Sequence, residues 1–276
     1  MASEAVFEQA LDAARALGVT EIETIETSHD EALTRFANNA IHQNVAERDS
    51  HLSVRVLTDG RTARASTNRL DGESIRGVVG EAVALARAGQ VDSGLLPLAA
   101  PAACRQPARW FESTAQATPG ERAGAVAEAI GVVEAAGQTA AGIYSTGETS
   151  FRLRNSRGLD ARHRETMARF SITAMAADSS GWAKASACDL RGLRPVELAR
   201  SAARKAALSR APRELPPGRY TVILEPAAVL DLVGQMFSDF SATAVRDGRS
   251  FLGGRMGARI FGENITIHDD ALDPLQ

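Results

Sequence analysis

The feature that most constrains the fold is an alternating run beside an Asp-Gly dipeptide. Residues 52–56 alternate apolar and polar side chains, Asp59-Gly60 follows, and apolar residues return at alternate positions after residue 61. Alternation with a period of two is typical of a strand with one buried face, and Asp-Gly favours the tight turn of a hairpin. The sequence therefore predicts antiparallel strands here.

Helical patterns flank this hairpin. Residues 3–17 repeat apolar side chains at helical spacing and end at Gly18, and a second such pattern follows Asp71, which is suited to cap a helix. Short strands with a turn at Asn38-Asn39 are expected between the two helices. Residues 1–89 are thus predicted to form an N-terminal α+β domain.

A second mixed unit is expected after a proline-containing stretch, residues 90–117, which is interpreted as a linker or a surface-hugging connection. Thr118-Pro119-Gly120-Glu121 has the pattern of a capping box and predicts a helix to about Ala136. Several short strands separated by turn residues follow up to residue 187. Residues 118–212 are predicted to form a middle domain with a helix and an antiparallel meander.

The last segment begins with a strand pattern over Gly218–Glu225 and a helix starting at Pro226. Glycines then recur, and Asn264–His268 resembles another strand. We expect residues 213–276 to be the start of a β-rich C-terminal domain that is cut short, because so few elements cannot build a covered sheet. The predicted fold class is α+β, with two small helix-and-sheet units before this incomplete domain.

Composition excludes some classes of protein. The net charge of −3 gives no strong attraction to nucleic acid or anionic lipid, and no apolar run reaches the ~18 residues of a membrane span. The N-terminal residues lack an export pattern, and Cys104 and Cys188 are isolated. A cytoplasmic protein with free thiols is therefore expected.

Candidate site residues are few. Asp231, Gln235 and Asp239 are spaced four apart, so they form either a polar site facing a partner's cleft or simply the solvated side of a helix. His268 precedes Asp269 and Asp270, which is consistent with a metal group or with an ordinary loop.

A second local concentration is basic. Six arginines lie between residues 152 and 169, but few aromatics accompany them for base stacking, so a solvated sheet face is favoured over a nucleic-acid site.

Three stretches in order resemble the TldD/PmbA (TldD/TldE) family. Ser53–Arg61 is similar to its first domain, Asn155–Gly158 to its second, and Gly218–Gln235 to the start of its third. TldD-type subunits carry His-Glu-x-x-x-His on the helix of that third domain. When the predicted helix of this chain is aligned with the TldD-type helix on a shared Val-Gly, the histidine positions fall on Leu230 and Gln235. The glutamate position falls on Asp231. The chain is therefore most similar to the PmbA-type (TldE) subunit, which lacks the motif.

The resemblance implies a heterodimeric zinc metallopeptidase that degrades or trims unfolded peptides. This chain would be the non-catalytic subunit, with no catalytic or metal-binding residue of its own, and would pair with a TldD-type subunit that holds the zinc, or with itself. Asp231, Gln235, Asp239 and His268 are the candidates for lining the cleft, and an added strand is the expected form of the bound peptide. Two alternatives remain: a peptidase that acts alone through ligands such as His268 and Asp269, and a non-enzymatic binding protein.

Overall fold

The computed structural model describes residues 2–273, and contacts between residues divide the chain into two compact units. The first unit runs to Ser209, and the second comprises Arg210–Ala271. All strands lie in the first unit, whereas the described residues of the second form only short helices and irregular segments. The mixture of helices and antiparallel strands confirms the predicted α+β class.

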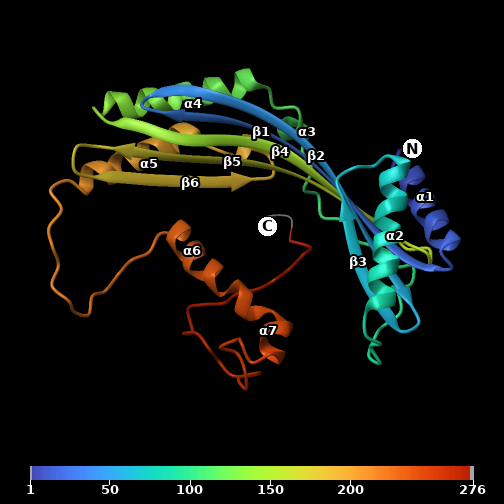
Figure 1. Cartoon of the computed structure of the whole chain (residues 1–276). Helices are drawn as coiled ribbons and strands as arrows, with labels where there is room; N and C mark the ends of the chain where they lie inside the picture. Colours follow the sequence, from blue (N-terminus) through green and yellow to red (C-terminus); the bar gives the residue numbers. More distant parts are fainter. Residues whose placement is uncertain (1, 274–276) are drawn as a thin grey trace. The chain divides into compact units, whose positions relative to one another are not determined.

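The first unit is built on one antiparallel sheet of six strands in the order β3-β2-β1-β4-β5-β6 (Figure 1). The strands are β1 (Glu21–Ala37), β2 (Ala40–Thr58), β3 (Arg61–Thr67), β4 (Thr139–Asn155), β5 (Asp160–Met175) and β6 (Ser180–Ala187). β1 pairs with β4 from Glu23–Asn155 to Phe36–Gly142. The two units expected from the sequence therefore share a continuous sheet, and whether either folds alone stays a prediction.

The helices of the first unit cover one face of this sheet in two separate groups (Figure 1). At one end, α1 and α2 bury Ile22 of β1 with Val54 and Val56 of β2; at the other, α4 and α5 cover Phe36 and Phe170. Ile22 and Phe36 are an even number of residues apart on β1, so both cores lie on the same face. These helices are α1 (Ala2–Ala16), α2 (Gly72–Ala88), α3 (Glu112–Ala115), α4 (Pro119–Ala135) and α5 (Pro195–Leu208), with a 3-10 turn, η1 (Leu190–Gly192), before α5.

Local turn and capping predictions are confirmed. Asn38 and Asn39 have φ of 50° and 59°, and Asp59-Gly60 has 49° and 69°, which is the left-handed region that tight hairpins require. Thr118 accepts a hydrogen bond from the Glu121 N–H at 3.2 Å, and the Glu121 carboxylate accepts one from the Thr118 N–H at 2.7 Å. Asp71 caps α2 by accepting from the Ser74 N–H at 3.0 Å.

Strand lengths differ from the prediction. The several short runs expected between residues 140 and 187 are two long strands and one short one, because β4 continues unbroken through Gly147. A side chain at Gly147 would come within 2.7 Å of the Asp30 carbonyl on β1, so glycine permits the close pairing there. Cross-strand pairing thus overrides a residue that is usually read as a breaker.

The predicted linker packs closely against the sheet. Leu98 is buried, and its carbonyl accepts a hydrogen bond from Arg157 at 2.6 Å. Further along, the Arg109 carbonyl accepts from the Thr166 N–H of β5 at 3.0 Å. The segment is therefore a surface-hugging connection that includes the short helix α3.

The second unit contains α6 (Pro226–Met236), a 3-10 turn η2 (Phe237–Phe240) and α7 (Ala242–Arg246). The strands predicted at Gly218–Glu225 and Asn264–His268 are not formed. A strand needs a neighbour for its peptide groups, and none pairs with these segments within the described residues. Among those residues of the unit, only Ala244 is buried.

Within residues 2–273, no helix is both long enough and apolar enough to cross a bilayer.

α5 approaches the sheet closely because it presents alanines. Ala199, Ala202 and Ala206 are fully buried, and a Cβ built on Gly181 of β6 would lie 2.0 Å from the Ala202 carbonyl oxygen. We expect Gly181→Ala to destabilise the protein by about 1–3 kcal/mol, since the helix must move away. Urea unfolding followed by circular dichroism measures this.

Gly131→Ala is the matched control, because Gly131 lies within α4 with no atom within 4 Å of a built Cβ. This change should stabilise the protein by about 0.5–1 kcal/mol through helix propensity. Equal effects of the two substitutions would contradict the close packing of α5 on β6.

Candidate functional site

The predicted polar stripe begins on α6. Asp231 and Gln235 are exposed and share one face of this helix, whereas Asp239 lies beyond its end, on η2. Asp239 is half-buried, and its carbonyl accepts a hydrogen bond from Ser250 Oγ at 2.6 Å. The helix thus brings only two of the three predicted residues together, and whether they line a cleft stays a prediction.

The side chains at the motif positions of α6 do not fit a zinc site. Leu230, 64% exposed, has no donor atom, and Gln235 offers only an amide. Zinc in proteins takes thiolate, imidazole or carboxylate ligands, of which only Asp231 supplies one. His268 is exposed in an irregular segment, and the described residues contain no group of three or more His, Cys, Asp or Glu arranged to hold a metal ion.

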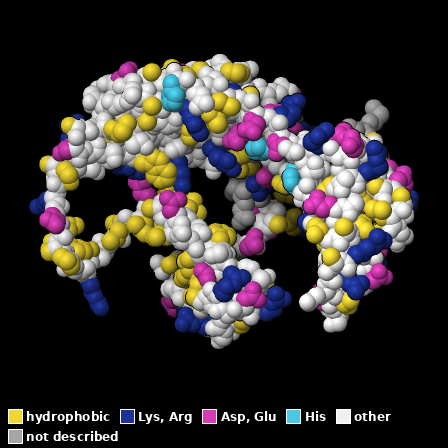
Figure 2. All heavy atoms as spheres, viewed as in Figure 1, with side chains coloured by type: hydrophobic (Ala, Val, Ile, Leu, Met, Phe, Trp, Pro, Cys, Tyr) yellow, Lys and Arg dark blue, Asp and Glu magenta, His cyan; other side chains and the backbone are white. Residues whose placement is uncertain are grey.

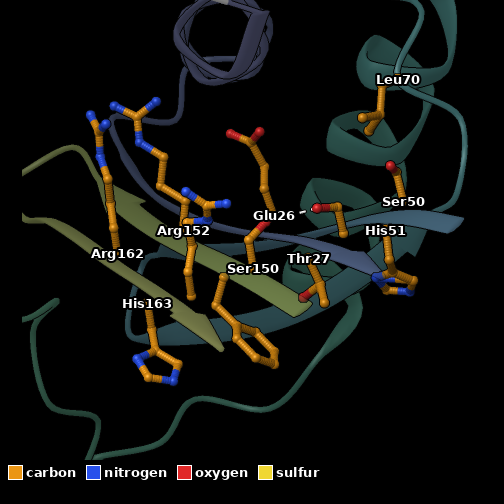
Figure 3. Close-up of a pocket in the computed structure, with 12 residues that line it drawn as sticks. Glu26, Thr27, Ser50, His51, Leu70, Ser150, Arg152, Arg162 and His163 are labelled. Atoms are coloured by element: carbon orange, nitrogen blue, oxygen red, sulfur yellow. Dashed lines mark hydrogen bonds between the residues drawn. The ribbon is translucent and has the colours of Figure 1, made fainter. Parts of the chain in front are cut away.

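A polar hollow of about 330 Å³ lies over the centre of the sheet, where the long strands run between the two helix groups. Figure 3 shows Glu26, Arg152 and Arg162 projecting to one side of the strands, and Thr27 and His163 to the other. The register explains this division, because Glu26 lies opposite Arg152, which lies opposite Arg162. The lining comes from β1, β2, β4 and β5, with Leu70 from the segment before α2.

Ion pairs hold the arginines at this hollow. Asp160 accepts hydrogen bonds from Arg152 at 2.8 Å and from Arg162 at 3.1 Å, and these bonds hold the pKa of the Asp160 carboxyl well below its ordinary range. Arg164 donates to Glu148 at 3.1 Å and stacks on the Trp110 ring at 4.3 Å.

Figure 2 shows acidic and basic side chains intermingled on this part of the first unit. Four of the six arginines, Arg152, Arg154, Arg162 and Arg164, pair with carboxylates, which favours the solvated sheet face over a nucleic-acid site.

Hydroxyl groups at the hollow pair with each other. Ser28 Oγ and Ser150 Oγ lie 2.7 Å apart on the same side as Arg152. His163 projects from the opposite face, where its ring stacks on Phe151 at 6.5 Å. On that face His29 Nδ1 lies 2.9 Å from the hydroxyl of Thr149, whereas Ser28 and Ser150 pair with each other on the helix-bearing face. The hollow therefore offers polar groups for binding.

The sequence alone did not identify Glu26, Ser28, Ser50 or Ser150 as neighbours. Each is an ordinary polar residue on a strand, and only the pairing of β1 with β2 and β4 brings them together. A sequence pattern gives the face of a strand but not its partner strand.

Comparison with known proteins identifies three consecutive family domains. Residues 21–86 match PmbA/TldA metallopeptidase domain 1, residues 113–210 match the central domain, and residues 217–276 match the C-terminal domain. An uncharacterized protein of Methanocaldococcus jannaschii is 32% identical over 125 residues, which cover 43% of this chain and 28% of that protein.

Solved structures share the fold at low identity. A candidate modulator of DNA gyrase from Thermotoga maritima matches with a TM-score of 0.78 at 22% identity, over 92% of this chain and 59% of that one. TldE from Thermococcus kodakarensis matches with 0.72 at 16% identity, over 90% and 58%. A candidate modulator of DNA gyrase from Bacteroides thetaiotaomicron matches with 0.71 at 17% identity, over 91% and 60%. The chain thus spans less than two thirds of each of these proteins.

Asp160 makes stability depend on pH. Its pKa is lowered in the folded state, so its contribution is complete above the unfolded value of about 3.9 and is lost as the pH falls through the folded value. We expect Asp160→Asn to lower the melting temperature by about 2–4 °C at pH 7, and the difference to shrink as the pH falls from 4 towards 2.

Thermal unfolding at several pH values tests this expectation, with Asp12→Asn as the control. Asp12 makes one exposed contact, to Arg15 at 3.5 Å, so its removal should matter little. A difference between the protein and Asp160→Asn that is the same at pH 7 and pH 2 would contradict the ionic role of Asp160.

Proposed function

The chain belongs to the PmbA/TldD metallopeptidase family, and from that premise we propose that it is a non-catalytic, PmbA-type (TldE-like) subunit of a zinc peptidase complex. The observation that carries the proposal is the donor set on α6, where Leu230 and Gln235 fall on the two histidine positions when the helix is aligned on Val233-Gly234. A helix without imidazoles at these positions cannot hold the metal as a TldD-type helix does.

In this proposal the partner is a TldD-type subunit, and the zinc and the acid–base chemistry of amide hydrolysis belong to it. The complex degrades or trims unfolded peptides in the cytoplasm. This chain contributes binding surface: exposed polar groups on α6, with Asp239 and His268, line the substrate cleft beside the partner. A pair of two copies of this chain is the alternative assembly.

The six-stranded sheet supports a role in peptide binding. Extended peptides bind proteins by adding a strand to an exposed sheet edge, and such binding uses backbone groups and tolerates many sequences. A peptidase that acts on unfolded chains benefits from this tolerance.

The test measures zinc by mass spectrometry and cleavage of an unfolded peptide, for the full chain alone and mixed with a TldD-type subunit. We expect zinc and cleavage in the mixture and neither in the chain alone. Asp231→Ala combined with Gln235→Ala should leave the zinc content of the mixture unchanged, because neither side chain is a ligand in this proposal.

Stoichiometric zinc and cleavage by the chain alone would overturn the proposal. His268→Ala and Asp269→Ala would then show whether these residues bind the metal. The mixture should lose its zinc on treatment with a chelator and regain cleavage when zinc is restored, which distinguishes a metal site from simple association.

A further inference from the structure

The middle of β2 forms an open edge of the sheet. β3 pairs with β2 only from Leu52 to Thr58, so residues 43–49 of β2 pair with β1 alone. Every one of these seven residues is exposed. An edge of this length is a template for another strand.

The direction of the peptide groups along this edge follows from two contacts. The Val56 carbonyl accepts a hydrogen bond from Thr62 Oγ1 of β3 at 2.9 Å, so residue 56 turns its peptide groups away from β1. Ile22, opposite Val56 on β1, turns its own N–H and C=O the other way, to Ser156.

The register is regular between residues 44 and 56, so Asn44, Ala46 and Arg48 also point their N–H and C=O groups outward. In the described part of the chain, no hydrogen bond reaches these outward groups.

The charge beside this edge selects the occupant. Glu47 and Asp49 project on the sheet face that carries no helix of the first unit. Glu47 lies directly opposite Glu31 of β1, and Asp49 lies opposite His29, which also contacts Glu31 at 3.3 Å. One imidazole thus faces three carboxylates. Like charges directly opposite each other are destabilising unless a cation approaches. Arg48 projects from the other face, where it pairs with Asp30. An added strand places alternate side chains opposite Glu47 and Asp49, where basic residues fit.

A second copy of this chain supplies no such cation. In antiparallel pairing, residues directly opposite each other share a face, so Glu47 would meet Gln43, Val45, Glu47 or Asp49 of the other copy. None of these side chains is basic. The charges therefore favour a peptide over self-association at this edge.

We infer that residues 43–49 of β2 bind an extended peptide as an added antiparallel strand and prefer lysine or arginine at alternate positions. The inference rests on the proposed function in taking peptide as the ligand, and it names the binding edge and the preferred peptide chemistry.

The probes are fluorescein-labelled ten-residue peptides, and fluorescence anisotropy with the full chain measures their binding. One alternates threonine with lysine, and a second replaces each lysine with glutamine. A third has the lysines in one block, and a fourth carries N-methyl groups on the threonine amides, which face β2 when the lysines lie opposite Glu47 and Asp49. We expect the alternating lysine peptide to bind about fivefold more tightly than the glutamine peptide, from two exposed ion pairs. The block peptide should bind more weakly at equal charge, and the methylated peptide should not bind.

Variants of residues 46, 47 and 49 separate the contribution of backbone hydrogen bonds to binding from that of the ion pairs. Ala46→Pro removes an outward N–H, which an edge strand tolerates, and should weaken binding of both unmethylated alternating peptides about tenfold. Ala46→Thr keeps the N–H and is the matched control. Glu47→Gln with Asp49→Asn should abolish the preference for lysine and leave binding of the glutamine peptide unchanged.

Equal binding of the methylated peptide, or no effect of Ala46→Pro in a folded variant, would overturn the inference. Self-association that Ala46→Pro abolishes, without peptide binding, would assign the edge to a second copy instead. Cleavage by the mixture with a TldD-type subunit is a separate readout. If the mixture cleaves peptide although no peptide binds residues 43–49, the proposed function stands and the inference fails. If peptide binds residues 43–49 but the mixture does not cleave it, only the proposed function is rejected.

Discussion

The structure of the first unit depends on the pairing of β1 with β4. These strands lie more than a hundred residues apart in the sequence, yet they pair along nearly their whole length. This pairing fuses a hairpin that carries α1 and α2 with a meander that carries α4 and α5. Because both helix groups take the same face and opposite ends, the centre of the sheet carries no helix, and the polar hollow lies there.

Sequence reasoning succeeded where the determinants are local. The positive φ values at Asn38-Asn39 and Asp59-Gly60, the Thr118–Glu121 capping box and the Asp71 cap each depend on a few adjacent residues. Sequence reasoning was wrong about strand lengths, and about the strand at Gly218–Glu225, because a strand exists only with a partner. The ion pairs of Asp160 and the lining of the hollow depend on register, which no local pattern specifies. Of the predicted site residues, only Asp231 and Gln235 share one element.

Family membership and side-chain chemistry constrain different parts of the function. The matches to all three family domains establish the family of this chain, and the structural likeness to solved proteins at low sequence identity establishes a common fold. Neither specifies which groups react. On α6, a leucine and an amide at the aligned histidine positions leave one carboxylate, and one carboxylate alone does not make a zinc site. This chemistry is the ground for the proposed division of labour, in which one subunit reacts and the other binds.

The two hydrophobic cores share no side chain, and this separation has a mechanical consequence. Four long strands, β1, β2, β4 and β5, are the main connection between the cores. A packing defect in one core therefore has no shared side chain through which it reaches the other core, and only the strand backbones link the two.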